Sequence, residues 1–280
     1  MRFRKIKRLL RDLFDFSRNR IYTGDTSVCL KDPLAKMQHC RIKLDGDSRL
    51  NLKPGVRLDH VRIQIADGSC LTIAAGTILC DVDICIWNHS SVSIGERCDI
   101  RTVRMVVENG KAEIGSDNHM SPGEKAEMPC INVSHGSIFI EDHNNLKNTI
   151  WVRFGGVLHI GRFNCINEGT ELRCDDSIRI GSFNMISYNC DIWDTNTHSR
   201  YTLEEKQEMF AGTFPKIGLE KVKPKTLPVV IGDGNWIGKY ACILKGTRIG
   251  NNVSVGTRAI ASNMDLEDGR TLVPEKSTVL

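Results

Sequence analysis

A branched apolar residue recurs every six positions, and this period constrains the fold more than any other feature of the chain. Its most regular run comprises Ile231, Ile237, Ile243, Ile249 and Val255. A period of six matches neither an α-helix nor simple strand alternation. It fits a triangular coil in which each side is a short strand, each corner is a turn and the branched residue points inward. A β-sandwich with regular turns rarely produces such a run, so we predict an all-β parallel β-helix.

The six-residue period is grouped into a longer unit of about 20 residues. Similar phrases mark this unit, and their anchor residues are Leu52, Ile73, Ile94, Ile114, Ile140, Ile160, Ile180 and Ile231. Two longer steps between anchors predict insertions, a short one near His119–Met128 and a long excursion at Ser199–Val229 with a helix-prone piece from Leu203 to Phe210. Long excursions from a rigid solenoid are typical of loops that help to form a site.

Glycine follows four of the five anchors in the regular run, at Gly232, Gly238, Gly250 and Gly256. We expect this glycine to permit a backbone conformation that is costly for other residues. Apolar residues make up 40% of the chain but aromatic residues only 6%. This composition favours a narrow core of stacked aliphatic side chains over a core built on large rings.

The basic residues of the chain are concentrated at its N-terminus. Residues 1–20 contain eight Lys or Arg against Asp12 and Asp15, whereas the rest of the chain is slightly acidic, which argues against a nucleic-acid-binding face. Apolar residues at helical spacing within 2–16 predict an amphipathic helix, either lying on anionic lipid through residues 2–20 or capping the open end of the solenoid. The predicted domains are a basic helix with its lead-in (1–27), a β-helix (28–265) with its excursion (199–229), and a C-terminal tail (266–280).

The 11 cysteines show no CxxC pair and no metal-ligand spacing. No secretory apolar segment precedes them, and no apolar run approaches the ~18 residues of a membrane span. We therefore expect small buried thiols in a cytoplasmic protein, and no bound metal.

The stretch IGDGNWIGKYACILKGTRIGNNVSVGTRAIAS, residues 231–262, resembles the C-terminal coils of the hexapeptide-repeat acyltransferases. It is most similar to the maltose, galactoside and polysaccharide O-acetyltransferases, and the upstream phrase CDIWDTNTHSR resembles the Thr-His segment in which their catalytic base lies. The resemblance implies a left-handed parallel β-helix, acetyl-CoA as the acyl donor, and a homotrimer with active sites between subunits.

Among the eight histidines, His198 lies where the repeat breaks and the long excursion begins. Acyl transfer to a hydroxyl needs a base that is neutral near pH 7, so His198 is the predicted catalytic residue. Asp191, Asp194 and Asn196 could orient its imidazole or bind sugar hydroxyls, and Asp194 and Asn196 are the predicted substrate ligands. His143 is a weaker alternative base.

The predicted coenzyme A ligands lie in the C-terminal coils, at Trp236, Gly238, Lys245, Thr257 and Arg258. An outward-facing Trp236 offers a flat surface to a pantetheine arm or a sugar ring, or else packs between subunits. The basic side chains Lys239, Lys245, Arg248 and Arg258 lie off the inward positions, where they could bind phosphate or form a solvated basic face.

The sequence thus predicts an acetyl-CoA-dependent O-acetyltransferase of a carbohydrate, such as a bacterial capsule or lipopolysaccharide polysaccharide or its precursor. We expect it in the cytoplasm, either free or peripheral at the inner face of the membrane. Two alternatives stay open: N-acetylation of an amino sugar, and a non-catalytic β-helix scaffold. Arg258 stands where the family has a small residue, and the family's closing Gly-x-Pro-Ala phrase is absent; both departures favour the scaffold.

Overall fold

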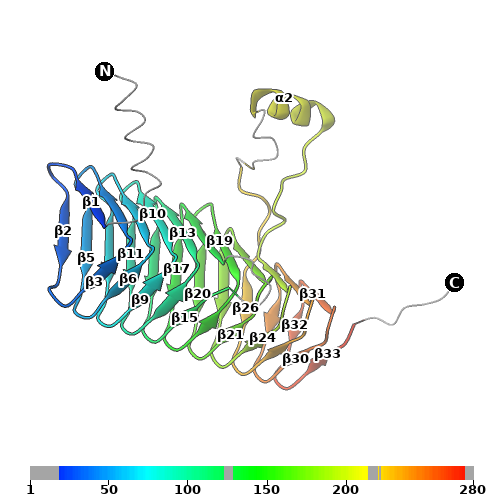
Figure 1. Ribbon diagram of the computed structural model, residues 1–280. Coiled ribbons are helices and arrows are strands. Elements are labelled where there is room, and N and C mark those ends of the chain that lie inside the picture. Colours follow the sequence, from blue (N-terminus) through cyan, green and yellow to red (C-terminus); the bar gives the residue numbers. More distant parts are fainter. Residues whose placement is uncertain (1–18, 123–128, 214–219, 221, 275–280) are drawn as a thin grey trace.

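The computed structural model describes residues 19–122, 129–213, 220 and 222–274, and they form a parallel β-helix (Figure 1). The chain winds through three sheets in turn, and each described sheet contains 11 parallel strands. The predicted β-helix is therefore confirmed. The predicted N-terminal helix lies outside the described residues.

The strands of each sheet follow one another along the axis of the prism. Sheet A contains β1 (Arg20–Thr23), β4 (Arg41–Leu44), β7 (Arg62–Ile65), β10 (Asp83–Trp87), β13 (Arg104–Glu108), β16 (Cys130–Ser134), β19 (Thr149–Val152), β22 (Glu171–Cys174), β25 (Asp191–Trp193), β28 (Cys242–Leu244) and β31 (Ile260–Ser262). Sheet B contains β2 (Val28–Lys31), β5 (Arg49–Leu52), β8 (Cys70–Ile73), β11 (Ser91–Ile94), β14 (Lys111–Ile114), β17 (Ser137–Ile140), β20 (Val157–Ile160), β23 (Ser177–Ile180), β26 (Val229–Ile231), β29 (Arg248–Ile249) and β32 (Asp265–Leu266). Sheet C contains β3 (Lys36–Gln38), β6 (Arg57–Asp59), β9 (Ile78–Cys80), β12 (Asp99–Arg101), β15 (His119–Met120), β18 (Asn145–Leu146), β21 (Cys165–Ile166), β24 (Met185–Ile186), β27 (Trp236–Ile237), β30 (Ser254–Val255) and β33 (Thr271–Leu272).

The predicted anchor residues all lie at the ends of strands of sheet B, from Leu52 in β5 to Ile231 in β26, and all are buried. Because strand side chains alternate, every second residue enters the prism and stacks on its counterpart one coil away. The resulting core is a continuous column of Ile, Leu, Val and a few Cys and Met side chains. The six-residue period is therefore the distance from one inward position to the corresponding position on the next side.

The glycine that follows an anchor has a different role from the one predicted. The φ angles of Gly232 and Gly238 are not positive, so their conformations are open to other residues. Instead, a Cβ on Gly232 would lie 2.5 Å from the carbonyl oxygen of Gly250, and one on Gly238 would lie 2.6 Å from the nitrogen of Thr257. Glycine is needed at these positions because consecutive coils approach each other closely. The residues with left-handed φ angles, such as Gly234 and Gly246, lie at the corners instead.

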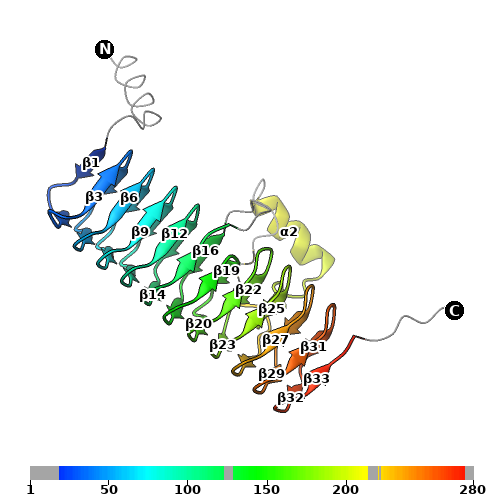
Figure 2. The same cartoon turned by 60° about the horizontal axis from the view of Figure 1, so that its bottom comes forward.

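The described strands extend beyond the predicted limits of 28 and 265, since β1 begins at Arg20 and β33 ends at Leu272. These outer strands bury few side chains, so an apolar period does not detect them, although their backbones pair with the adjoining coils. The long excursion leaves after β25 and returns at β26, and it contains α2 (Leu203–Thr213). Figure 2 shows α2 lying outside the prism. The short insertion falls between β15 and β16.

The eleven cysteines are free thiols, four of them fully buried and seven partly buried. Burial, with smaller contributions from the charges of Asp117 and Asp142, raises the pKa of the Cys98 thiol to about 11. Among the described helices, none is long and apolar enough to cross a lipid bilayer.

Candidate active site

The two ends of the excursion are fastened together where it leaves the corner between sheets A and B. Thr195 and Thr226 form an antiparallel bridge. The N–H of Asn196 donates to the Lys225 carbonyl at 3.0 Å, and the N–H of Leu227 donates to the Asp194 carbonyl at 3.0 Å. The residues just beyond this clamp are therefore held at a fixed place beside the coils.

His198 lies directly beyond the clamp, with its imidazole 59% exposed. Its Nδ1 is 3.0 Å from Oε2 of Glu220, whose side chain is only 1% exposed. A carboxylate can only accept, so Nδ1 carries the hydrogen and Nε2 keeps its lone pair. This pairing leaves an exposed imidazole of fixed orientation with one nitrogen free to accept a proton.

Glu220 is held in its ionised form by the groups around it. Burial acts to raise its pKa, but hydrogen bonds from Tyr201, His198 and Ser199 outweigh burial and lower the pKa below its ordinary value. The Tyr201 hydroxyl donates to Oε1 of Glu220, and this bond raises the pKa of Tyr201. A charged carboxylate against Nδ1–H stabilises the imidazolium that forms when Nε2 takes a proton.

Glu220 was not among the predicted site residues. It lies 22 residues after His198 within the excursion, so neither periodicity nor sequence proximity pointed to it. Tyr201 is only three residues from His198, but a tyrosine on a loop carries no signal by itself. The sequence analysis singled out His198 but not Glu220 or Tyr201, the two side chains that hold it in the structure.

Asp194 does not have its predicted role of substrate ligand or partner of His198. Its side chain is fully buried, and its two oxygens accept the backbone N–H groups of Asp175 and Asp176 at 2.8 Å each. Burial raises the pKa of Asp194 despite these bonds. At this corner the carboxylate oxygens take the place of the backbone carbonyls that would otherwise accept these two N–H groups. Asp194 thereby connects the start of the excursion to the preceding coil.

Asp191 and Asn196 differ in their access to solvent. Asp191 is partly buried in β25, where Oδ2 lies 3.8 Å from Sγ of Cys242, and burial raises its pKa. Asn196 is exposed, and its carbonyl accepts the N–H of His198 at 2.7 Å. Of the two predicted acceptor ligands, Asn196 is therefore the one that is accessible beside His198.

Four of the five predicted coenzyme A ligands lie together on two adjoining coils at a different edge of the prism. Trp236 in β27 is 55% exposed and pairs in register with Ser254 of β30. Gly238 packs under the backbone of Thr257. The N–H of Arg258 donates to the carbonyl of Lys239 at 2.9 Å, at the corner between sheets C and A. We call Trp236, Gly238, Thr257 and Arg258 the sheet C group.

Tyr240 joins this group although the sequence analysis did not single it out. The Lys239 ammonium lies 4.8 Å and the Arg258 guanidinium 5.7 Å from the centroid of its ring. Two cations over one exposed ring concentrate positive charge next to Trp236. This arrangement suits a ligand that carries both a phosphate and an apolar arm.

Lys245, the fifth predicted ligand, lies apart from the sheet C group and beside the excursion. The next residue, Gly246, donates its N–H to the carbonyls of Leu227 and Pro228. Lys245 therefore shares the corner between sheets A and B with His198. One chain does not bring the predicted ligands into a single pocket.

His143, the alternative base, lies at the third corner, between sheets B and C. Its ring stacks on Phe163 with a centroid separation of 4.7 Å, and Nε2 is 3.7 Å from Oδ2 of Asp117. Phe163 stacks in turn on Phe183. His143 is thus part of an aromatic column on another edge from the excursion.

Residues 228–260 match the family model described as bacterial transferase hexapeptide (six repeats). The six-residue repeat of these C-terminal coils is therefore similar to the one that this family model describes. A galactoside O-acetyltransferase of Escherichia coli strain K12 is 22% identical over 153 residues, which are 55% of this chain and 68% of that protein. The matched enzyme is an acetyltransferase, which is the class of enzyme that the sequence analysis predicted for this chain.

Two solved structures match this chain over most of its length. The polySia-specific acetyltransferase NeuO matches with a TM-score of 0.39 and 13% identity, over 88% of this chain and 76% of NeuO. The polysialic acid O-acetyltransferase OatWY matches with a TM-score of 0.40 and 17% identity, over 87% of this chain and 92% of OatWY.

Proposed function

We propose that this chain transfers an acetyl group from acetyl-CoA to a hydroxyl of a carbohydrate, with His198 as the general base. The observation that carries the proposal is the exposed imidazole whose Nδ1 is fixed by the buried, ionised Glu220. The similarity to a galactoside O-acetyltransferase supports a saccharide hydroxyl as the acceptor. A bacterial surface polysaccharide or its precursor is the proposed substrate class.

The reaction follows from the protonation state of His198. Nε2 takes the proton of the acceptor hydroxyl while the hydroxyl oxygen attacks the thioester carbonyl carbon. The C–S bond then breaks, and the imidazolium returns the proton to the departing coenzyme A thiolate. Glu220 faces Nδ1–H throughout, so it stabilises the transient positive charge without itself taking the proton.

The sheet C group is the proposed contact for coenzyme A. The flat face of Trp236 suits the pantetheine arm, and Arg258 with Lys239 suits the phosphates. Arg258 stands where related enzymes have a small residue, but it lies over Tyr240 at an outer corner, where it leaves the prism interior undisturbed.

A homotrimer is part of the proposal because the two groups of ligands lie on different edges of one prism. A neighbouring subunit could present its sheet C group to the excursion of the first. The helix α2 buries none of its own residues in the single chain, and Leu203 is 65% exposed, which is consistent with a partner surface there. The free thiols agree with a cytoplasmic location.

The test is acetyl transfer from acetyl-CoA to a panel of saccharides, with the acetylated product measured by mass spectrometry. We expect His198→Ala to lower kcat by ~10²-fold or more, the contribution of a general base. Glu220→Gln should lower kcat less, and His143→Ala is the matched control that should leave it unchanged. Loss of activity in His143→Ala with His198→Ala active would move the base to His143. No transfer to any saccharide, with no coenzyme A binding, would favour the scaffold.

A further inference from the structure

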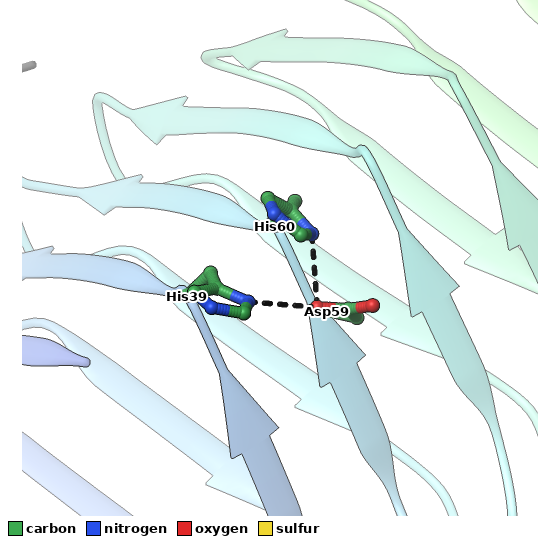
Figure 3. A group of neighbouring side chains, drawn as sticks. All are labelled: His39, Asp59 and His60. Carbon is green, nitrogen blue, oxygen red and sulfur yellow. Dashed lines mark hydrogen bonds and ion pairs between the residues drawn. The ribbon is translucent and has the colours of Figure 1, made fainter. Parts of the chain in front are cut away.

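Three potential metal ligands meet in the first coils of the described solenoid (Figure 3). They are far along the chain from the candidate active site. The ligand atoms of His39, Asp59 and His60 all lie within 4.8 Å of one another. Nδ1 of His39 is 3.4 Å and Nδ1 of His60 is 2.9 Å from the same oxygen, Oδ1 of Asp59. All three side chains are at least partly exposed.

The coil geometry explains why these residues converge. His39 and His60 follow β3 and β6 at the corner between sheets C and A, and both have left-handed φ angles, 54° and 52°. The N–H of His60 donates to the carbonyl of Gln38, which places the two histidines one coil apart. Their rings consequently stack, with centroids 4.4 Å apart and an interplanar angle of 24°. In the next two coils this corner is occupied by Asp81 and Thr102.

We propose that His39, Asp59 and His60 bind a divalent transition-metal ion. Bond lengths of about 2.0–2.2 Å around a tetrahedral ion separate neighbouring ligand atoms by about 3.4 Å. The two distances to Asp59 are 3.4 and 2.9 Å, so two of the three edges already have this length within about 0.5 Å. The third edge, between the ligand nitrogens of His39 and His60, is no longer than 4.8 Å, and rotation of the exposed His60 side chain would shorten it. The solvent side leaves room for water as the fourth ligand.

The surroundings of the cluster determine which ions fit. Asp59 also lines a shallow groove of about 740 Å³, together with the basic side chains Lys36, Arg57 and Arg101. Arg101 is paired with Asp99 at 2.7 Å, but the groove remains rich in positive charge. Hard cations such as Mg²⁺ and Ca²⁺ bind through charge and oxygen ligands, whereas imidazole nitrogen favours Ni²⁺, Cu²⁺ and Zn²⁺. The site is therefore selective for the second class.

Such an ion would clamp the first two coils together. His39 belongs to one coil and Asp59 and His60 to the next, so the ion crosses the interface between them. The end of a solenoid has neighbours on one side only and opens more readily than its middle. The sequence analysis expected no metal because it searched for closely spaced ligands; here the coil length of about 20 residues brings distant ligands together.

The test is calorimetric titration of the full-length protein with Ni²⁺, chosen because the chain's thiols compete for softer ions. His39→Asn and His60→Asn remove one ligand each, and asparagine tolerates the left-handed conformation. The matched control is His89→Asn, an exposed histidine at a left-handed corner position with no ion pair to any described residue. Thermal unfolding of each variant without metal verifies its fold.

We expect one saturable Ni²⁺ site in the wild type and in His89→Asn. The affinity of this site for Ni²⁺ should be at least ~10-fold lower in His39→Asn and His60→Asn. Ni²⁺ should also raise the Tm of the wild type but not that of the two ligand variants, and Mg²⁺ should do neither. Equal binding by all four proteins, or no binding at millimolar Ni²⁺, would overturn the proposal.

Discussion

A column of buried asparagine residues offers the sharpest test of how the coils hold together. Asn118, Asn144, Asn164, Asn184 and Asn235 occupy the same position in successive coils, and each is almost fully buried. Along this column the side-chain oxygen of one asparagine accepts the backbone N–H of the next. Each amide therefore replaces a backbone partner that the corner cannot supply.

Replacing Asn184 by alanine removes two interactions whose sizes can be estimated. The N–H of Asn235, which donates to Oδ1 of Asn184 at 2.9 Å, is left unpaired in the interior at a cost of about 1–3 kcal/mol. The bond from Nδ2 of Asn184 to Oδ1 of Asn164, 3.0 Å long, is also lost and contributes about 0.5–1.5 kcal/mol. We expect a destabilisation of about 2–4 kcal/mol around this coil.

Amide hydrogen exchange is the appropriate assay, because a repeat array can open locally without unfolding as a whole. The Asn235 amide should exchange about 30- to 1000-fold faster in Asn184→Ala, the equivalent of that free energy. The matched control is Asn251→Ala. Its Oδ1 accepts the N–H of Asp233 at 2.8 Å on the exposed surface, where water can replace it. Equal acceleration of exchange at the Asn235 amide in Asn184→Ala and at the Asp233 amide in Asn251→Ala would refute the reasoning.

Three further predictions follow from the packing and the ionisation states. Ile192→Ala, at a fully buried position just before the excursion, should destabilise the protein by about 2–5 kcal/mol in urea unfolding; a loss below 1 kcal/mol would contradict the tight core. Since the pKa of Cys98 is raised to about 11, only about one thousandth of this thiol is ionised at pH 8, and mass-spectrometric mapping should find it unalkylated until the chain unfolds. The pKa of Glu220 is lowered in the folded state, so its stabilising effect is present above its unfolded pKa of 4.5 and is lost as the pH falls through the folded value. Hydrogen exchange at the backbone amide of His198 should accelerate over that acidic range in the wild type but not in Glu220→Gln.

The interior of this protein could be predicted from its sequence because each inward position is filled by the same class of side chain. From Leu52 to Ile231, the anchors identify one face of one sheet, and the alternation within each strand supplies the rest of the core. The role of Gly232 could not be predicted in the same way. Its requirement comes from the distance to Gly250 in the following coil, which is a property of stacked coils and not of the local sequence.

The candidate histidine, His198, could be singled out from the sequence and its partner Glu220 could not, for a physical reason. His198 marks the point where a regular pattern stops, and the end of a pattern can be seen in one sequence. Glu220 can reach His198 because the Thr195–Thr226 bridge closes the base of the excursion and brings its two ends together. No periodic signal determines such a return, so the partner becomes known only when the fold of the loop is known.

Most of the candidate functional side chains lie at the corners of the prism, where the six-residue repeat says least about which residue is present. An inward residue must match its neighbours along the core, whereas a corner residue in the left-handed conformation is at least partly exposed and lies beside the corresponding residue one coil away. His39 and His60 stack in this way at one corner, and Tyr240 and Arg258 meet at the same corner near the other end of the solenoid. Side chains that are separated by a coil length in the sequence thereby become neighbours, at a spacing set by the coils and not by the residues themselves. A search for function in such a chain should therefore compare residues one coil apart at the corners, because that is where the fold can assemble a site without disturbing its core.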